Sequence, residues 1–144
     1  MLMTTTTSIA CAEATAAATA TATAATAAPR EILMVTTTVA TEAEAKRLAH
    51  SVLHARLAAC VQVEPITAYF HWEGALEECR ELRVACKTAA SAMPALMALL
   101  RKQHPYTLPQ LVVQPVQASA EYGCWVDEQL APAPQRQEPA MAMA

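Results

Sequence analysis

The stretch from Cys60 to Thr88 constrains the fold of this chain more than any other part of the sequence. It is typical of two β-strands that fold back at Trp72-Glu73-Gly74, and three of the six aromatic side chains of the sequence lie just before that turn. Side chains of a strand alternate between two faces. Here the apolar positions change from odd numbers (Val61, Val63) to even numbers at Pro65. This change of parity predicts an extra residue, a β-bulge, at Pro65, which has no N–H to donate to a ladder.

The returning strand fixes the expected turn and suggests a second chain. If the apolar faces of the two strands coincide, Trp72 lies opposite Leu76, which leaves Glu73-Gly74-Ala75 as a three-residue loop. The half of the strand next to the turn, residues 77–83, is dense in charge and too long for one small domain to cover. A long hairpin with unpaired edges usually pairs with another chain, and a second copy is the simplest partner.

The rest of the chain divides into one folded domain and two flanking segments. From Thr4 to Ala28, 21 of the 25 residues are Ala or Thr. Such a segment buries too little apolar surface to offset the entropy of ordering, so residues 1–29 are predicted to be a disordered leader. It has neither the features of a secretory signal nor those of a mitochondrial presequence. The Pro-rich residues 131–144 predict a disordered tail. The folded domain is therefore expected over residues 30–130.

Charge and cysteine content exclude several classes of protein. The net charge is −3, without basic clusters, which argues against nucleic-acid binding. No apolar run is long enough to span a membrane. The five cysteines are odd in number and include no CxxC pair, so we expect reduced cytoplasmic thiols.

The order of expected elements gives the fold class. Residues 31–38 predict a strand, and Thr41 with Glu44 forms a capping box for a helix that ends near Leu57. After the hairpin, Ser91 is expected to cap a second helix, with Pro94 in its first turn. A strand over residues 110–117, in which Pro115 indicates a sheet edge or a bulge, and a last helix beginning at Ser119 complete the chain. The order predicts an α+β fold, a ferredoxin-like βαββαβ sandwich with a long β-hairpin and a C-terminal helix. Its uncovered sheet face is a second reason to expect self-association.

Few residues suggest chemistry. His50 and His54 have the spacing that lets two imidazoles hold one metal ion, but neighbouring Arg47 and Arg56 would repel a cation, so a solvated polar face is the favoured interpretation. His104 is a candidate metal ligand, although the dipole of the helix it ends also explains a histidine there.

Three cysteines and one lysine leave further alternatives. Cys60, Cys79 and Cys86 could act as soft copper ligands, but Cys79 and Cys86 have opposite parity in one strand, and Cys86 is most simply a core residue. Lys87 either pairs with a glutamate or lines a polar cleft with Glu73 and Tyr122. With two glycines and no nucleophile–base pair, the chain is not expected to be an enzyme.

Five short motifs in order resemble the CutA family of divalent-cation tolerance proteins. They are Leu57-Ala58-Ala59-Cys60-Val61, Trp72-Glu73-Gly74, Lys87-Thr88, His104-Pro105-Tyr106 and the pair Tyr122 and Trp125. The resemblance covers residues 32–130. It implies a ferredoxin-like subunit of a homotrimer whose hairpins pair between subunits, and a cytosolic protein linked to tolerance of copper and other divalent ions.

The resemblance is weakest at the copper site that it implies. The family's ligand positions, a cysteine, a histidine and a glutamate, correspond here to Thr37, Gln103 and Gln110, all poor copper ligands.

The leading hypothesis is a non-enzymatic homotrimer that binds copper or another divalent cation, with His104 as the metal ligand. The alternatives are a sensor of small molecules, in the manner of PII signalling proteins, and a structural scaffold for a partner. A sensor would use an intersubunit cleft lined by Trp72, Glu73, Lys87, His104, Tyr106, Tyr122 and Trp125.

Overall fold

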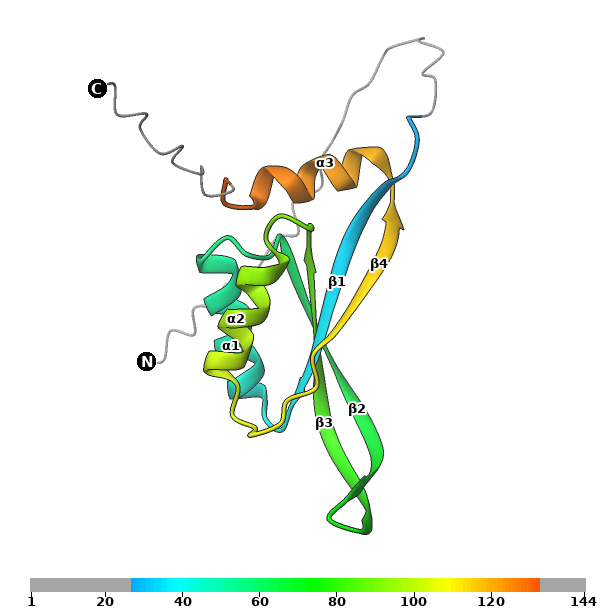
Figure 1. Ribbon diagram of the computed structural model, residues 1–144, viewed down its shortest axis with the longest axis vertical. Helices are drawn as coiled ribbons and strands as arrows, with labels where there is room; N and C mark the ends of the chain where they lie inside the picture. The colour runs from blue at the N-terminus through cyan, green and yellow to red at the C-terminus, as the bar shows by residue number, and fades with distance from the viewer. Residues whose placement is uncertain (1–26, 133–144) are drawn as a thin grey trace, which may run out of the picture.

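Four strands form one antiparallel sheet in the order β2-β3-β1-β4 (Figure 1). The structure, a computed structural model, describes residues 27–132. Its elements are β1 (Arg30–Val39), α1 (Glu42–His54), β2 (Cys60–Trp72), β3 (Ala75–Thr88), α2 (Met93–Gln103), β4 (Val112–Ala118) and α3 (Ala120–Gln129). This order confirms the predicted α+β, ferredoxin-like arrangement with a C-terminal helix. The predicted leader and tail lie almost entirely outside the described residues.

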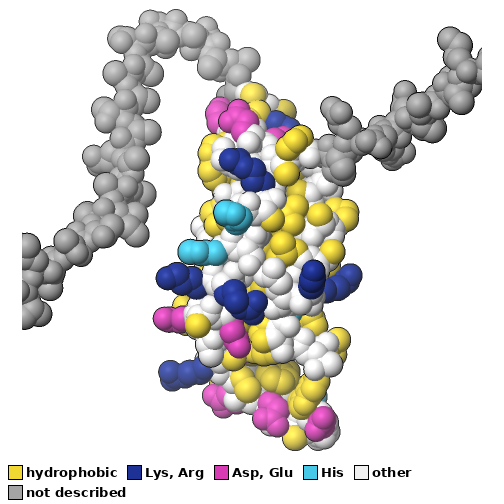
Figure 2. All heavy atoms as spheres, turned by 90° about the vertical axis from the view of Figure 1, so that its left-hand side faces the viewer, with side chains coloured by type: hydrophobic (Ala, Val, Ile, Leu, Met, Phe, Trp, Pro, Cys, Tyr) yellow, Lys and Arg dark blue, Asp and Glu magenta, His cyan; other side chains and the backbone are white. Residues whose placement is uncertain are grey.

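Helices α1 and α2 cover one face of the sheet, and the main core lies between them and the strands (Figure 1). Buried aliphatic side chains from both layers meet there, among them Val35, Leu48, Val84, Leu96 and Leu100. A smaller cluster, which includes Ile32 and Val126, holds α3 across the end of the sheet. The outer surface of the helical layer carries basic, acidic and histidine side chains, as expected of a solvated face (Figure 2). The sheet face turned away from α1 and α2 is called the open face below.

The helix boundaries follow from their capping residues, with two corrections. Thr41 and Glu44 form the predicted capping box of α1. The helix ends at His54 rather than near Leu57, and Leu53 in its last turn is 39 % exposed. The N-cap of α2 is Ala92, without a side-chain hydrogen bond, so the prediction of a Ser91 cap was wrong. Pro94 does lie in the first turn, where it is tolerated because N–H groups there have no partner within the helix.

The long hairpin is present, but its register differs from the prediction. The β2–β3 pairing runs without interruption from Cys60 opposite Lys87 to Trp72 opposite Ala75. No bulge occurs at Pro65, and Trp72 does not face Leu76. The turn is the two-residue Glu73-Gly74, both with positive φ (48° and 80°), the conformation that matches the twist of two antiparallel strands.

The change of parity at Pro65 therefore marks a change of covered face, not an inserted residue. Val61 lies opposite Cys86, on the face that packs against α1 and α2. Beyond Pro65 the hairpin extends past both helices (Figure 1), and the apolar positions move to the open face, with Phe70 opposite Glu77. Within one described chain, neither helix covers this half of the hairpin, and the loop after α2 lies against part of it.

Candidate functional site

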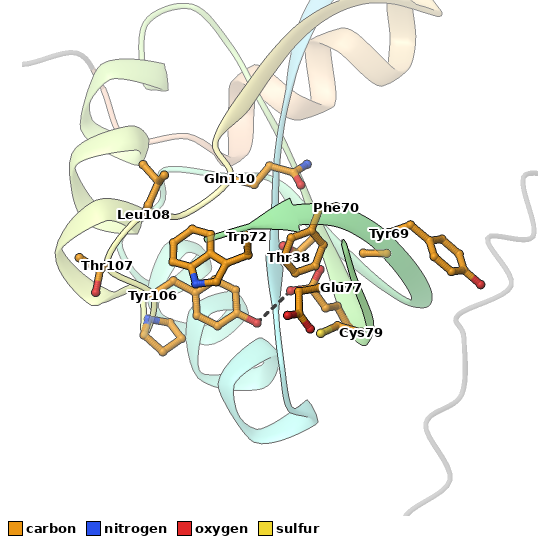
Figure 3. Close-up of a pocket in the computed structure, with 13 residues that line it drawn as sticks. Thr38, Tyr69, Phe70, Trp72, Glu77, Cys79, Tyr106, Thr107, Leu108 and Gln110 are labelled. Atoms are coloured by element: carbon orange, nitrogen blue, oxygen red, sulfur yellow. Dashed lines mark hydrogen bonds between the residues drawn. The ribbon is translucent and has the colours of Figure 1, made fainter. Parts of the chain in front are cut away.

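A cleft of about 680 Å³ lies between the hairpin tip and the loop that joins α2 to β4 (Figure 3). We call it the tip cleft. Its lining includes four aromatic rings and two carboxylates and consists of Thr38, Ala68, Tyr69, Phe70, Trp72, Glu77, Cys79, Glu81, Pro105, Tyr106, Thr107, Leu108 and Gln110. A cleft with flat rings and negative charge suits a small molecule that carries both an apolar part and a positive charge.

One hydrogen bond joins the two walls of the tip cleft. The Tyr106 hydroxyl donates to Glu81 Oε1 at 2.9 Å (Figure 3). Burial and this bond to the carboxylate raise the pKa of Tyr106 to about 12. The phenol therefore keeps its proton at neutral pH, and the bond ties the loop to β3.

His104 lies behind that loop, with both ring nitrogens in use. Its Nδ1 accepts a hydrogen bond from the Tyr106 backbone N–H at 3.0 Å. An imidazole that accepts at Nδ1 carries its proton on Nε2, and Nε2 lies 2.8 Å from the hydroxyl oxygen of Thr37, which is fully buried in β1. Burial lowers the pKa of His104, so the neutral ring is favoured. Binding a metal at Nε2 would require the ring to release Thr37.

The residues considered as metal ligands do not gather around His104. Thr37 contacts it through a hydroxyl, and Gln110 lines the tip cleft instead. Cys86 is fully buried, as predicted for a core residue, and burial raises the pKa of its thiol to about 12. Over residues 27–132, no three His, Cys, Asp or Glu side chains come together in a way that could hold a metal ion.

The residues expected in an intersubunit cleft lie at two separate ends of the chain's fold. Trp72 and Tyr106 line the tip cleft, with Glu73 in the turn beside it. At the other end of the hairpin, the Lys87 ammonium lies 5.3 Å from the centre of the Tyr122 ring. Trp125 lies next to that ring, with 5.5 Å between the ring centres. One chain does not bring the two groups together.

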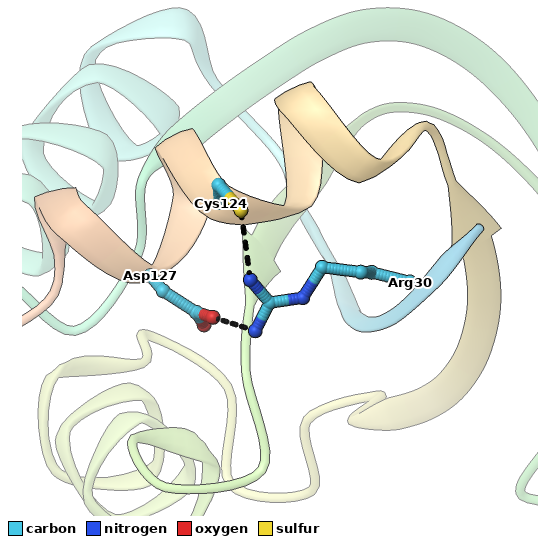
Figure 4. Close-up of polar contacts among 3 residues, drawn as sticks. All are labelled: Arg30, Cys124 and Asp127. Atoms are coloured by element: carbon cyan, nitrogen blue, oxygen red, sulfur yellow. Dashed lines mark hydrogen bonds and ion pairs between the residues drawn. The ribbon is translucent and has the colours of Figure 1, made fainter. Parts of the chain in front are cut away.

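Sequence reasoning missed a polar cluster at the start of β1. Arg30 donates to the Cys124 thiol at 3.0 Å and forms an ion pair with Asp127 (Figure 4). This cluster fixes α3 to the first residue of the sheet. No local signal reveals it, because the partners are separated by more than ninety positions. The bonds that His104 and Tyr106 make to strand residues also join positions far apart in the sequence, so no local signal reveals them either.

Comparison with known proteins agrees with the fold and the motifs. The family profile described as CutA1 divalent ion tolerance protein matches residues 33–129. The divalent-cation tolerance protein CutA of Pectobacterium atrosepticum is 37 % identical over 102 residues, which cover 69 % of this chain and 93 % of that protein. The corresponding protein of Thermus thermophilus is 36 % identical over 97 residues, which cover 66 % and 94 %.

Solved structures give the same result. CutA from Synechococcus elongatus superimposes with a TM-score of 0.67 at 37 % identity, over 70 % of this chain and 91 % of that one. The Thermus thermophilus protein gives a TM-score of 0.66 at 35 % identity, over 71 % and 100 %. Among the described helices, none has the length and hydropathy needed to cross a bilayer. Profile, sequence relatives and solved structures all match the same part of the chain, which therefore belongs to the CutA family of divalent-cation tolerance proteins.

Proposed function

We propose that the protein acts in tolerance of divalent cations as a homotrimer, and that it binds a ligand between subunits instead of catalysing a reaction. The half of the hairpin beyond Pro65 carries this proposal. Its apolar side chains are exposed in one chain, with Phe70 38 % and Trp72 49 % accessible, and β2 is one of the two edge strands of the sheet. Exposed apolar strands with free edges are a hazard for a monomer and are normally covered. The number three comes from the family resemblance.

Light scattering tests the assembly directly. At micromolar concentration we expect the mass of three chains, and a monomer would contradict the proposal. A trimer in which hairpins pair would also join the two groups of cleft residues, because the turn of one subunit could lie beside Lys87 and Tyr122 of the next.

We further propose that His104 binds copper, and the name of the family supports this proposal. Native mass spectrometry with Cu(II) counts chains and metal ions in one measurement. We expect one bound copper ion fewer per chain in His104→Ala than in the wild type, with His71→Ala, an exposed histidine on the hairpin, as the matched control. Absence of stoichiometric copper in the wild type, or equal copper in His104→Ala, would contradict this ligand assignment.

A small-molecule sensor is the second candidate, and the tip cleft favours it. Both nitrogens of His104 are occupied, whereas the cleft offers about 680 Å³ with carboxylates and aromatic rings. CutA from Synechococcus elongatus has been solved in complex with a Bis-Tris molecule, a small polyol amine. A thermal-shift panel of small amines and metabolites should show stabilisation that Glu77→Gln weakens. A flat panel would argue against the sensor.

We also propose a cytoplasmic location, on the basis of the unpaired cysteine pattern. The related protein of Archaeoglobus fulgidus is described as periplasmic, so cell fractionation is the appropriate test. Recovery in the periplasmic fraction would contradict the proposal.

A further inference from the structure

Two histidines on the outer surface of α1 lie one helical turn apart, on the opposite side of the molecule from the open face. His50 and His54 are both exposed, and no function described above uses either ring. Side chains four positions apart on a helix have Cβ atoms about 5–6 Å apart, on one side of the cylinder. The same spacing lets the two histidines of HExxH helices bind one zinc ion. Two histidine side chains lie close to each other on the helical face in Figure 2.

The nearby arginines, which the sequence suggested would repel a cation, are each hydrogen-bonded to a carbonyl, although Arg56 still lines a hollow with His54. Arg47 Nη2 donates to the Gln103 carbonyl at 3.0 Å, at the end of α2. Arg56 Nη1 donates to the Gln129 carbonyl at 3.3 Å, at the end of α3. Each guanidinium is thereby bound to a carbonyl of another element. Lys46 lies one turn before His50 on the same side of α1, so the site carries positive charge near it and would hold the ion weakly.

The surface around the two rings has room for an ion and its water. His50, Ser51, Leu53 and His54 line an open hollow. The described residues supply no third His, Cys, Asp or Glu ligand there. An ion held by two imidazoles would complete its coordination with water and would therefore exchange freely. Imidazole nitrogens suit copper, nickel and zinc, whereas magnesium and calcium require oxygen ligands.

We infer that His50 and His54 form a two-imidazole site for a divalent transition-metal ion on the outer surface of α1. The site does not depend on His104 or on trimer formation. Because the helical layer lies on the opposite side of the sheet from the open face, the site stays accessible when hairpins pair. It gives the chain a way to take up metal that needs none of the positions occupied by Thr37, Gln103 and Gln110.

Titration calorimetry with Ni(II) alone tests the site, because nickel does not oxidise the cysteine thiols as copper does. The full chain should bind Ni(II), and His50→Ala and His54→Ala should each weaken that binding at least tenfold, since a chelate needs both rings. The double variant should bind Ni(II) no more weakly than either single variant. A single variant with wild-type affinity would overturn the inference.

Two further variants test the spacing of the two rings and the independence of the site from His104. His54→Ala/Ala55→His keeps the number of histidines but places the second ring five positions from the first, off the shared face, and should lose binding like the single variants. Retained affinity in this variant would overturn the inference. His104→Ala should keep the nickel site, so copper binding at His104 and nickel binding on α1 can fail independently. Circular dichroism of the His50, His54 and Ala55 variants should match the wild type, because these three positions are exposed.

Discussion

His104 connects a strand and a loop through its two ring nitrogens. Nε2 contacts Thr37 in β1, and Nδ1 accepts from Tyr106, whose hydroxyl in turn reaches Glu81. The sequence suggested a dipole partner or a metal ligand for this histidine. It could not show that the ring fixes the loop to β1, because Thr37 lies 67 positions away. Thr37 and His104 meet only because β1 packs beside the end of α2 in the folded chain.

Thr37→Val should destabilise the fold, because it removes the hydroxyl that His104 Nε2–H contacts while keeping the shape of the side chain. A donor left without a partner in a part-buried site costs about 1–3 kcal/mol. Denaturant unfolding would measure the loss. Thr36→Val, on the opposite face of the same strand, should change the free energy of unfolding by less than about 0.5 kcal/mol. Equal effects would show that the contact with His104 contributes nothing.

The lowered pKa of His104 predicts a loss of stability in mild acid. Burial is the main cause of the lowered pKa, and Arg47 adds to it. A hydrogen bond to the Thr38 backbone opposes it, as do the carboxylates of Glu44 and Glu81. The unfolded chain takes up this proton near the ordinary value of 6.5, and the folded chain only at lower pH. The contribution is therefore complete above pH 6.5 and is lost as the pH falls through the lowered value.

Thermal unfolding between pH 8 and pH 5 checks this prediction. The midpoint should fall less steeply with acid in His104→Gln than in the wild type. His50→Ala, which removes an exposed imidazole, should keep the wild-type slope. A wild-type slope in His104→Gln would contradict the assignment.

Among the elements, the hairpin shows best what a sequence can and cannot predict. The two strands and the place where the chain folds back follow from local pattern and were found as expected. The turn itself was not, because it has the two residues Glu73-Gly74 and not the predicted three. The bulge at Pro65 was inferred because both halves were assumed to bury the same face. The alternation of apolar positions shows which face of a strand is apolar, but not which part of the protein covers that face. The tip half faces away from its own helices, so the correct register required the arrangement of the whole sheet.

The contact between α3 and β1 predicts an unusual effect of a helical glycine. A Cβ added at Gly123 would lie 2.8 Å from Arg30 Cβ, which is fixed to the backbone and cannot swing away. Gly→Ala inside a helix normally gains about 1 kcal/mol. Overpacking here costs about 1–3 kcal/mol, so Gly123→Ala should lower the free energy of unfolding. Glu128→Ala, on the exposed side of α3, is the control, and a stabilised Gly123→Ala would refute this packing.

At the scale of the whole molecule, the sheet has two faces with different requirements. One is sealed by α1 and α2 over a core of fully buried aliphatic residues. The open face carries Phe70 and Trp72 at its tip, both more than a third exposed. The proposed trimer assigns these side chains to contacts between subunits, and the helical layer to solvent.

A matched pair of substitutions tests this division. Phe70 and Leu53 are 38 % and 39 % exposed, so a new carboxylate should affect the isolated chain about equally at either position. Phe70→Asp should shift the mass measured by light scattering toward the monomer, because a charge would be buried between subunits. Leu53→Asp should leave the oligomer intact. The reverse result would place the interface on the helical layer.

The uninterrupted ladder beyond Pro65 has a consequence for the order of folding. A chain emerging from denaturant can complete its helical core alone, but on the proposed assembly its projecting hairpin finds cover only when other copies arrive. Refolding should therefore show an early phase whose rate is independent of protein concentration and a later phase that accelerates with it. Hydrogen exchange would identify the phases, with the amides of Val84 and Cys86 protected early and those of Phe70 and Trp72 late. The time between the two is when the exposed strands are most prone to aggregate.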